Sequence, residues 1–156
     1  MKAATLNEIK VELTNLPTAK VLELCLRLGR FKKENKELLT YLLFEAHNIP
    51  DFIENIKIEI ETQFQTINTS SVYFVKKSLR KILRLISKYS RYSGLANVDI
   101  ELLIYFCEQV NQLSSSFKTN LVIFNIYQFQ LKKIDKALAS LHEDLQYDYQ
   151  KQIDNL

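Results

Sequence analysis

Apolar residues recur every three or four positions along most of the chain, which is the spacing of one face of an α-helix. The first such segment starts near Thr5, which can cap it, and ends at the Leu16-Pro17 break. A second starts at Thr18 and ends in the charged turn at 32–35, and a third carries the leucines of 38–43. Because the connection between them is short and polar, the second and third segments predict an antiparallel helical hairpin.

The same spacing predicts three more helices before the final segment. In the fourth, Asn48 can be the cap and Pro50 suits the opening turn. Its alternating stretch IKIEIE could also be a strand, but a lone strand would have no partner. A fifth follows the potential caps of NTSS and ends near Gly94. Asn97 is expected to cap a sixth helix that runs to about residue 113.

The final segment, about 119–148, predicts a single long helix with an apolar seam. The seam residues step alternately by four and three positions, and they are Tyr127, Leu131, Ile134, Leu138, Leu141 and Leu145. Such a seam fits pairing with a second copy of the helix, and it fits packing inside the monomer equally well. We favour packing inside the monomer and keep a homodimer as the alternative.

Three short words recur in the same order along the chain. EIKVEL at 8–13 returns as NIKIEI at 55–60, LRL at 26–28 returns at 83–85, and ELLTYL at 37–42 returns as ELLIYF at 101–106. They predict two similar three-helix units, at about 5–46 and 51–113, because each unit has an apolar face to bury on another. Chance repetition in a Leu- and Ile-rich helical chain is the alternative.

The expected fold is therefore all-α: one domain over 1–156, with seven helices in two three-helix units and a long C-terminal helix. Its shape resembles a short array of the armadillo or HEAT kind, although the chain carries no motif of either family, and a closed bundle is the other possibility. Composition agrees, since 156 residues include only two Gly and two Pro, and 47% are apolar.

Composition also bears on location. Cys25 and Cys107 each lie in an apolar helical pattern with no Cys or His partner at metal-ligand spacing, so reduced thiols are expected. The first ten residues lack the apolar core of a signal peptide, and no apolar run reaches the ~20 residues of a membrane-spanning helix. These features favour a cytoplasmic protein with no membrane contact.

The charges are unevenly distributed. Between Thr62 and Val98 there are seven Lys or Arg and no Asp or Glu, although the whole chain has a net charge of only +3. On a helical wheel, the apolar side chains of this segment fall on one face and the cations fall on the opposite one. We call the second face the basic face, and it consists of Lys77, Arg80, Lys81, Arg84, Lys88 and Arg91, with Tyr73 beside them.

Two functions fit the basic face. It can bind a polyanion, either nucleic acid or an acidic protein, with the arginines on phosphates and Tyr73 stacking on a base. Alternatively, it is simply solvated, or it is neutralised by the acidic residues of the fourth helix, Asp51, Glu54, Glu59 and Glu61. The net charge is low for a nucleic-acid-binding domain, which favours the second reading.

The sequence lacks the residue spacings that are typical of known catalytic sites. His47 and His142 have no nucleophile or carboxylate at triad spacing, and neither forms the Glu-x-x-His pair of helical di-iron proteins. Two isolated glycines cannot build a phosphate-binding loop. We therefore expect a non-catalytic binding or scaffold module with no metal and no cofactor. The alternative is a structural protein that self-associates through its last helix.

Overall fold

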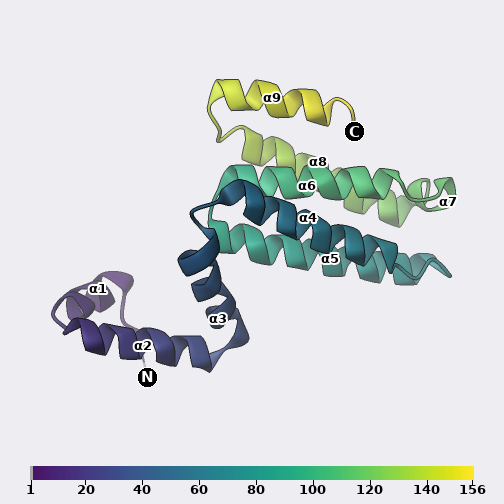
Figure 1. Ribbon diagram of the computed structural model, residues 1–156. Helices are drawn as coiled ribbons and strands as arrows, with labels where there is room; N and C mark the ends of the chain where they lie inside the picture. Colours follow the sequence, from purple (N-terminus) through teal and green to yellow (C-terminus); the bar gives the residue numbers. More distant parts are fainter. Residues whose placement is uncertain (1) are drawn as a thin grey trace. The chain divides into compact units, whose positions relative to one another are not determined.

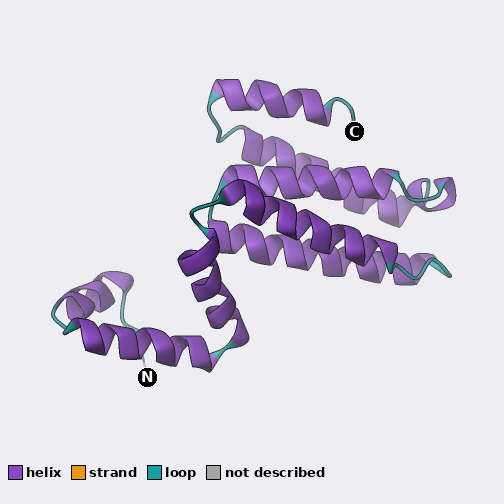
Figure 2. Cartoon of the chain, in the orientation of Figure 1, coloured by secondary structure: helices purple, strands orange, loops and turns teal. Residues whose placement is uncertain are grey.

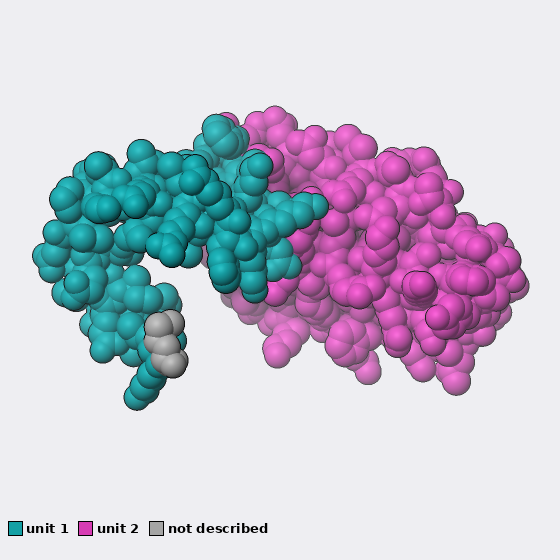
Figure 3. Space-filling model, turned by 90° about the horizontal axis from the view of Figure 1, so that it is seen from below, with its two compact units in different colours: residues 1–44 teal, residues 45–156 magenta. Residues whose placement is uncertain are grey.

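The computed structural model describes residues 2–156, and these residues are helical nearly throughout, with no strand among them (Figures 1 and 2). The chain divides into two compact units, residues 1–44 and residues 45–156, which are coloured separately in Figure 3. An all-α fold was predicted, and this part of the prediction is confirmed.

The first unit begins with α1, Leu6–Thr14, followed by α2, Thr18–Phe31, and α3, Lys33–Thr40. Thr5 caps α1 as predicted, since its hydroxyl accepts a hydrogen bond from the Glu8 amide while the Glu8 carboxylate accepts one from the Thr5 amide. The Thr5 amide, and after it the Thr5 hydroxyl, which also donates to the Glu8 carboxylate, lower the pKa of Glu8. The charged turn is shorter than expected, because Lys32 alone is extended and residues 33–35 already belong to α3.

The predicted hairpin of α2 and α3 is present, and a close approach of the two helices holds it. A Cβ added to Gly29 would lie 3.0 Å from Leu39 Cδ1, so the missing side chain lets α3 come near. The Asn35 side-chain amide donates to the Leu28 carbonyl over 2.9 Å. After α3 the chain widens into a π-helical turn, Tyr41–Glu45, which the apolar spacing of 38–43 did not reveal.

The second unit opens with α4, Ile49–Gln65, then α5, Val72–Ser93, and α6, Ala96–Asn111. The Asn48 side chain caps α4 by accepting from the Asp51 amide, and Pro50 lies in the first turn, both as predicted. The stretch IKIEIE is helical. Gly94 ends α5 with φ 65°, a left-handed conformation that Gly adopts at low cost.

Helix α6 is the centre of the second unit, and α4, α5 and α8 all pack against it. Half of its sixteen residues are buried, which explains why it is apolar on most of its circumference: Val98, Ile100, Leu102, Leu103, Ile104, Phe106, Cys107 and Val110. Each fully buried large apolar side chain contributes ~1.5–3 kcal/mol to folding. Burial, followed by the nearby Glu108, raises the pKa of the Cys107 thiol to about 12.

Two predictions are wrong: the cap at the start of α6 and the single long helix that was expected after it. Leu95, rather than Asn97, occupies the N-cap position of α6, because the helix already begins at Ala96. The single long helix over 119–148 is divided into α7, Ser115–Lys118, α8, Leu121–Leu138, and α9, Glu143–Ile153. Over residues 2–156 there are thus nine α-helices and one π-helical turn instead of seven helices.

Polar side chains end and restart the helices of the C-terminal segment. Asn120 caps α8 by accepting from the Val122 amide. The Ser140 hydroxyl donates to the Ala137 carbonyl after the last turn of α8, and the His142 imidazole caps α9 by accepting from the Asp144 amide. These local hydrogen bonds compete with helix continuation, which is why the apolar stepping did not extend into one helix.

The repeated words lie on the helices that the duplication requires. EIKVEL and NIKIEI fall within α1 and α4, the two LRL words fall within α2 and α5, and ELLTYL and ELLIYF begin in α3 and α6. The duplication itself stays a prediction. Among the described residues, no helix combines the length and the apolar character that crossing a membrane requires.

Candidate polyanion-binding face

Helix α5 separates its apolar and cationic side chains as the helical wheel predicted. Four of its apolar side chains are at most 1% exposed, and they hold the helix against the rest of the second unit: Val75, Leu79, Ile82 and Ile86. On the opposite side, five of the six cations of the basic face are exposed, namely Lys77, Arg80, Lys81, Arg84 and Arg91. Tyr73 is 61% exposed.

The cations of the basic face repeat along the helix every three or four residues. From Lys77 to Arg91 the face extends about 21 Å at the rise of an α-helix. Like charges at these spacings repel each other by a few tenths of a kcal/mol per pair, and no carboxylate on α5 offsets the repulsion. A bound anion would remove this repulsion.

A pocket of about 590 Å³ lies against the N-terminal half of the face. It is lined by Tyr73, Lys76, Lys77, Arg80, Leu83 and Arg84. The guanidinium groups of Arg80 and Arg84 can each bind a phosphate or carboxylate through paired N–H donors. Tyr73 and Leu83 supply an apolar wall. The pocket therefore combines four cations with one aromatic ring that is open to solvent.

The acidic residues of α4 do not neutralise the basic face. Among residues 2–156, Lys77, Arg80, Lys81, Arg84 and Arg91 make no ion pair with a carboxylate. The Arg84 and Arg91 side chains instead donate to backbone carbonyls of α5 itself, those of Arg80 and Ser87.

The four carboxylates of α4 that could have paired with the basic face make other contacts or are exposed. Glu59 accepts a hydrogen bond from the Tyr89 hydroxyl over 3.1 Å, and Asp51 bonds the Asn48 side chain at the start of α4. Glu54 and Glu61 are exposed and lie near Tyr105, whose pKa is raised by burial first and by these charges second. These contacts leave the five exposed cations of the basic face open to solvent.

Lys88 differs from the other cations of the basic face. It is only partly exposed, and its ammonium lies 4.5 Å from the centre of the Tyr89 ring and 6.0 Å from that of Tyr92. Tyr89 also meets Phe52 of α4 edge-to-face at 6.0 Å. These aromatic contacts hold Lys88 near the helix surface, so the exposed part of the face is carried by the other five cations.

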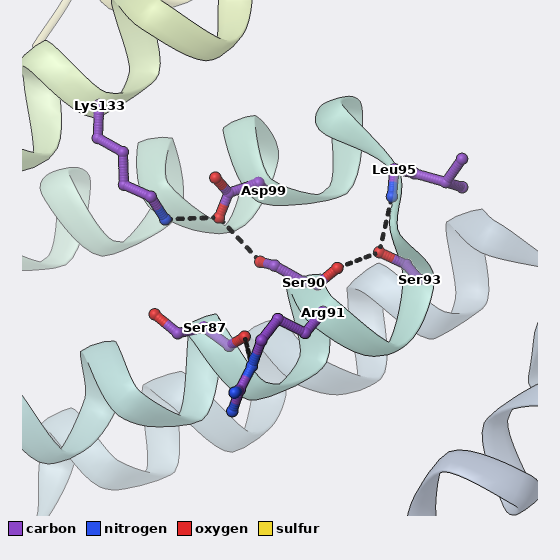
Figure 4. A network of polar contacts seen from close by, with 7 residues as sticks. All are labelled: Ser87, Ser90, Arg91, Ser93, Leu95, Asp99 and Lys133. Carbon is purple, nitrogen blue, oxygen red and sulfur yellow. Dashed lines mark hydrogen bonds and ion pairs between the residues drawn. The ribbon is translucent and has the colours of Figure 1, made fainter. Parts of the chain in front are cut away.

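A polar network fixes the C-terminal end of α5 (Figure 4). Asp99, in the first turn of α6, accepts from the Ser90 hydroxyl over 2.9 Å and from the Lys133 ammonium of α8 over 3.0 Å. The Ser93 hydroxyl donates to the Ser90 carbonyl and accepts from the Leu95 amide. Three helices thus meet at one carboxylate, which sets the position of the basic face on the second unit.

The apolar seam predicted for self-association is largely used inside the chain. Ile134 and Leu138 are buried where α8 packs against α6, and Tyr127, Leu131 and Leu141 are partly buried. Only Leu145, on the separate helix α9, is exposed, at 45%. The preference for packing inside the monomer fits this burial, whereas dimerisation stays a prediction.

The cysteines and histidines are not gathered into a site. Cys107 is buried in α6, and Cys25 is partly buried in a pocket of about 230 Å³ between α2 and α3. Within residues 2–156, no three His, Cys, Asp or Glu side chains are placed to hold a metal ion.

One curated protein matches most of this chain. The sister chromatid cohesion protein mis4 of Schizosaccharomyces pombe is 30% identical over 139 residues, which cover 83% of this chain. The chain spans only 8% of the length of that protein. No protein-family model matches the chain, and no solved structure matches it. The similarity therefore concerns one segment of a much longer protein, and it is compatible with a helical, scaffold-like chain.

Proposed function

We propose that this chain is a non-catalytic helical binding module whose basic face holds the phosphate backbone of a nucleic acid. The observation that supports the proposal most is the row of exposed cations on α5, Lys77, Arg80, Lys81, Arg84 and Arg91, none of which is paired with a carboxylate among the described residues. Cations spaced along one straight helix suit a linear polyanion better than a small one.

Nucleic acid is favoured over an acidic protein by two features. Tyr73 is exposed beside the arginines, where an aromatic ring can stack on a base or a sugar. The matching protein is named for the cohesion of sister chromatids, which consist of DNA and protein. Because contacts to phosphates carry no sequence information, binding through the basic face is expected to depend on charge and not on base sequence.

A titration with matched variants tests the proposal. A fluorescent duplex of about 20 base pairs is titrated with the chain at ~50 mM NaCl, where phosphate contacts are strong. Replacing two face residues, Arg80→Glu and Arg84→Glu, should weaken binding at least about tenfold, since two contacts become repulsive. The control carries Lys132→Glu and Lys136→Glu, two exposed lysines of α8, and has the same net charge.

The control separates a local contact from a general effect of charge. Binding within about threefold of the unchanged chain is expected for the α8 control, because its lysines lie outside the basic face. Equal losses in both variants would contradict the assignment of the face. If polyglutamate displaced the duplex at equal charge concentration, an acidic protein would replace nucleic acid as the proposed partner.

A further inference from the structure

The last helix, α9, has a charge opposite to that of α5. Between Glu143 and Asp154 there are four carboxylates, Glu143, Asp144, Asp148 and Asp154, and a single cation, Lys151. All five side chains are exposed, and so is Tyr147, at 64%. On a wheel at 100° per residue these six residues cover one side of α9, and the buried Tyr149 lies on the other.

Partly buried polar contacts keep this acidic side turned to solvent. The Tyr149 hydroxyl donates to Glu101 of α6 over 2.9 Å, and Glu101 also lies 3.7 Å from the Lys57 ammonium. Burial, together with this hydrogen bond, raises the pKa of Tyr149. At the end of the helix, the Leu156 carbonyl accepts from Asn111 and Tyr127. These contacts fix the inner side of α9 and leave its carboxylates without a cation from α5.

The basic and acidic helices lie at opposite edges of the second unit. In Figure 1, α9 is drawn at the upper edge and α5 at the lower edge, with α6 and α8 between them. The basic face of α5 and the acidic side of α9 both point away from the buried core, as the exposure of their residues requires. Within one unit the two surfaces therefore cannot meet.

The two surfaces match in length as well as in charge. The carboxylates of α9 extend about 16 Å, and the basic face extends about 21 Å, at the rise of an α-helix. Each surface also offers an exposed tyrosine, Tyr147 on α9 and Tyr73 beside the pocket of α5. We propose that the basic face of α5 binds the acidic side of α9 from a second copy of this chain.

The proposed contact joins unlike surfaces, so in a pair one copy keeps a free acidic helix and the other keeps a free basic face. Contacts of this kind continue into rings or open chains. One helix laid on another buries less than the ~1,000 Å² of a stable interface, so the association should be weak and reversible. Exposed ion pairs are screened by salt, and raising NaCl from about 50 to 500 mM should weaken it at least about tenfold.

Self-association would also regulate the proposed nucleic-acid binding, because both use the basic face. This competition rests on the proposed function, whereas the contact between copies does not. A duplex added to the associated protein should dissociate it. If the duplex fails to bind while the copies still associate, the proposed function fails and the self-association stands.

Sedimentation equilibrium of the whole chain, with charge-reversed variants, tests the contact. One variant carries Arg80→Glu and Arg84→Glu on α5, and the other carries Asp148→Lys and Asp154→Lys on α9. Neither Asp is buried, and a Lys is favourable at the C-cap of α9, which Asp154 occupies, so α9 should remain folded. Circular dichroism checks that both variants keep the helix content of the unchanged chain.

The unchanged chain should associate as its concentration rises from about 10 µM to 1 mM at low salt, the range in which weak contacts form. Each variant alone should be monomeric, and an equal mixture of the two should associate again, because each supplies the charge that the other needs. A monomeric unchanged chain, association that persists in either variant alone, or a mixture that stays monomeric would overturn the proposal.

Discussion

Replacing Asp99 by Ala should destabilise the second unit, because this carboxylate joins α5, α6 and α8. Its side chain is 18% exposed and accepts hydrogen bonds from Ser90 and Lys133. The hydrogen bond from Ser90 to a charged acceptor contributes about 1.5 kcal/mol, and the partly exposed pair with Lys133 contributes ~0.5 kcal/mol. Its position at the N-terminus of α6 adds about 0.5 kcal/mol. The free energy of unfolding should therefore fall by about 2–3 kcal/mol.

Urea unfolding followed by circular dichroism measures this loss. The control is Asp135→Ala, at an exposed carboxylate of α8 that has no side-chain partner among residues 2–156, and it should change the free energy of unfolding by less than ~0.5 kcal/mol. Asp99→Asn keeps a hydrogen-bond acceptor for Ser90 and loses the charge, so it should lie between the two. A loss below about 1 kcal/mol for Asp99→Ala, or a loss equal to that of the control, would refute this account of how α5 is held.

Three further outcomes follow from the fold. Gly94→Ala should cost about 1 kcal/mol in circular-dichroism melts, since Gly94 has φ 65° and no atom of the described residues beyond its chain neighbours lies within 4 Å of a Cβ placed there, which leaves backbone strain as the main effect. A thiol reagent at neutral pH should modify Cys25 quickly and Cys107 only after unfolding, because burial raises the pKa of Cys107 to about 12. Phe106→Ala should lower the free energy of unfolding by about 3–5 kcal/mol, and a loss below 1 kcal/mol would contradict its place in the core.

The sequence was most informative where one physical signal acted locally. Apolar spacing located α4 and α5, and Thr5, Asn48 and Gly94 marked helix ends because each makes a short-range contact or conformation that its residue type favours. The division of α5 into a buried and a cationic side was predictable for the same reason, since a straight helix places residues at fixed angles.

Other features depended on competition between alternative local structures, such as helix continuation and a side-chain cap, which apolar spacing alone does not resolve. The seam from Leu138 to Leu145 continues in register across the break at 139–142, but the hydrogen bonds of Ser140 and His142 end one helix and start the next. Nothing in the leucine pattern of 38–43 distinguished an α-helical from a π-helical turn. The acidic side of α9 was not predicted, because the long helix expected over 119–148 ended in the middle of what is the separate helix α9.

For the candidate site, sequence reasoning found the residues but not their surroundings. Asp51, Glu54, Glu59 and Glu61 are close to α5 along the chain, and only the fold shows that Glu59 bonds Tyr89 instead of a cation of the basic face. The Asp99 network joins residues that are 9 and 34 positions apart, and no local pattern announces it. Cytoplasmic location, the identity of a partner and dimerisation remain predictions.

The salt dependence of nucleic-acid binding tests the central claim most directly. Binding of the duplex is measured from about 30 to 200 mM NaCl for the unchanged chain and for a variant with Arg80→Gln and Arg84→Gln, which removes two cations without adding carboxylates. Because each phosphate contact contributes about −0.9 to the slope of log K against log salt, the slope of the variant should be less steep by about 1.8. Equal slopes for the two proteins, or no binding of the unchanged chain at the lowest salt, would contradict the proposal that the basic face of α5 holds phosphates.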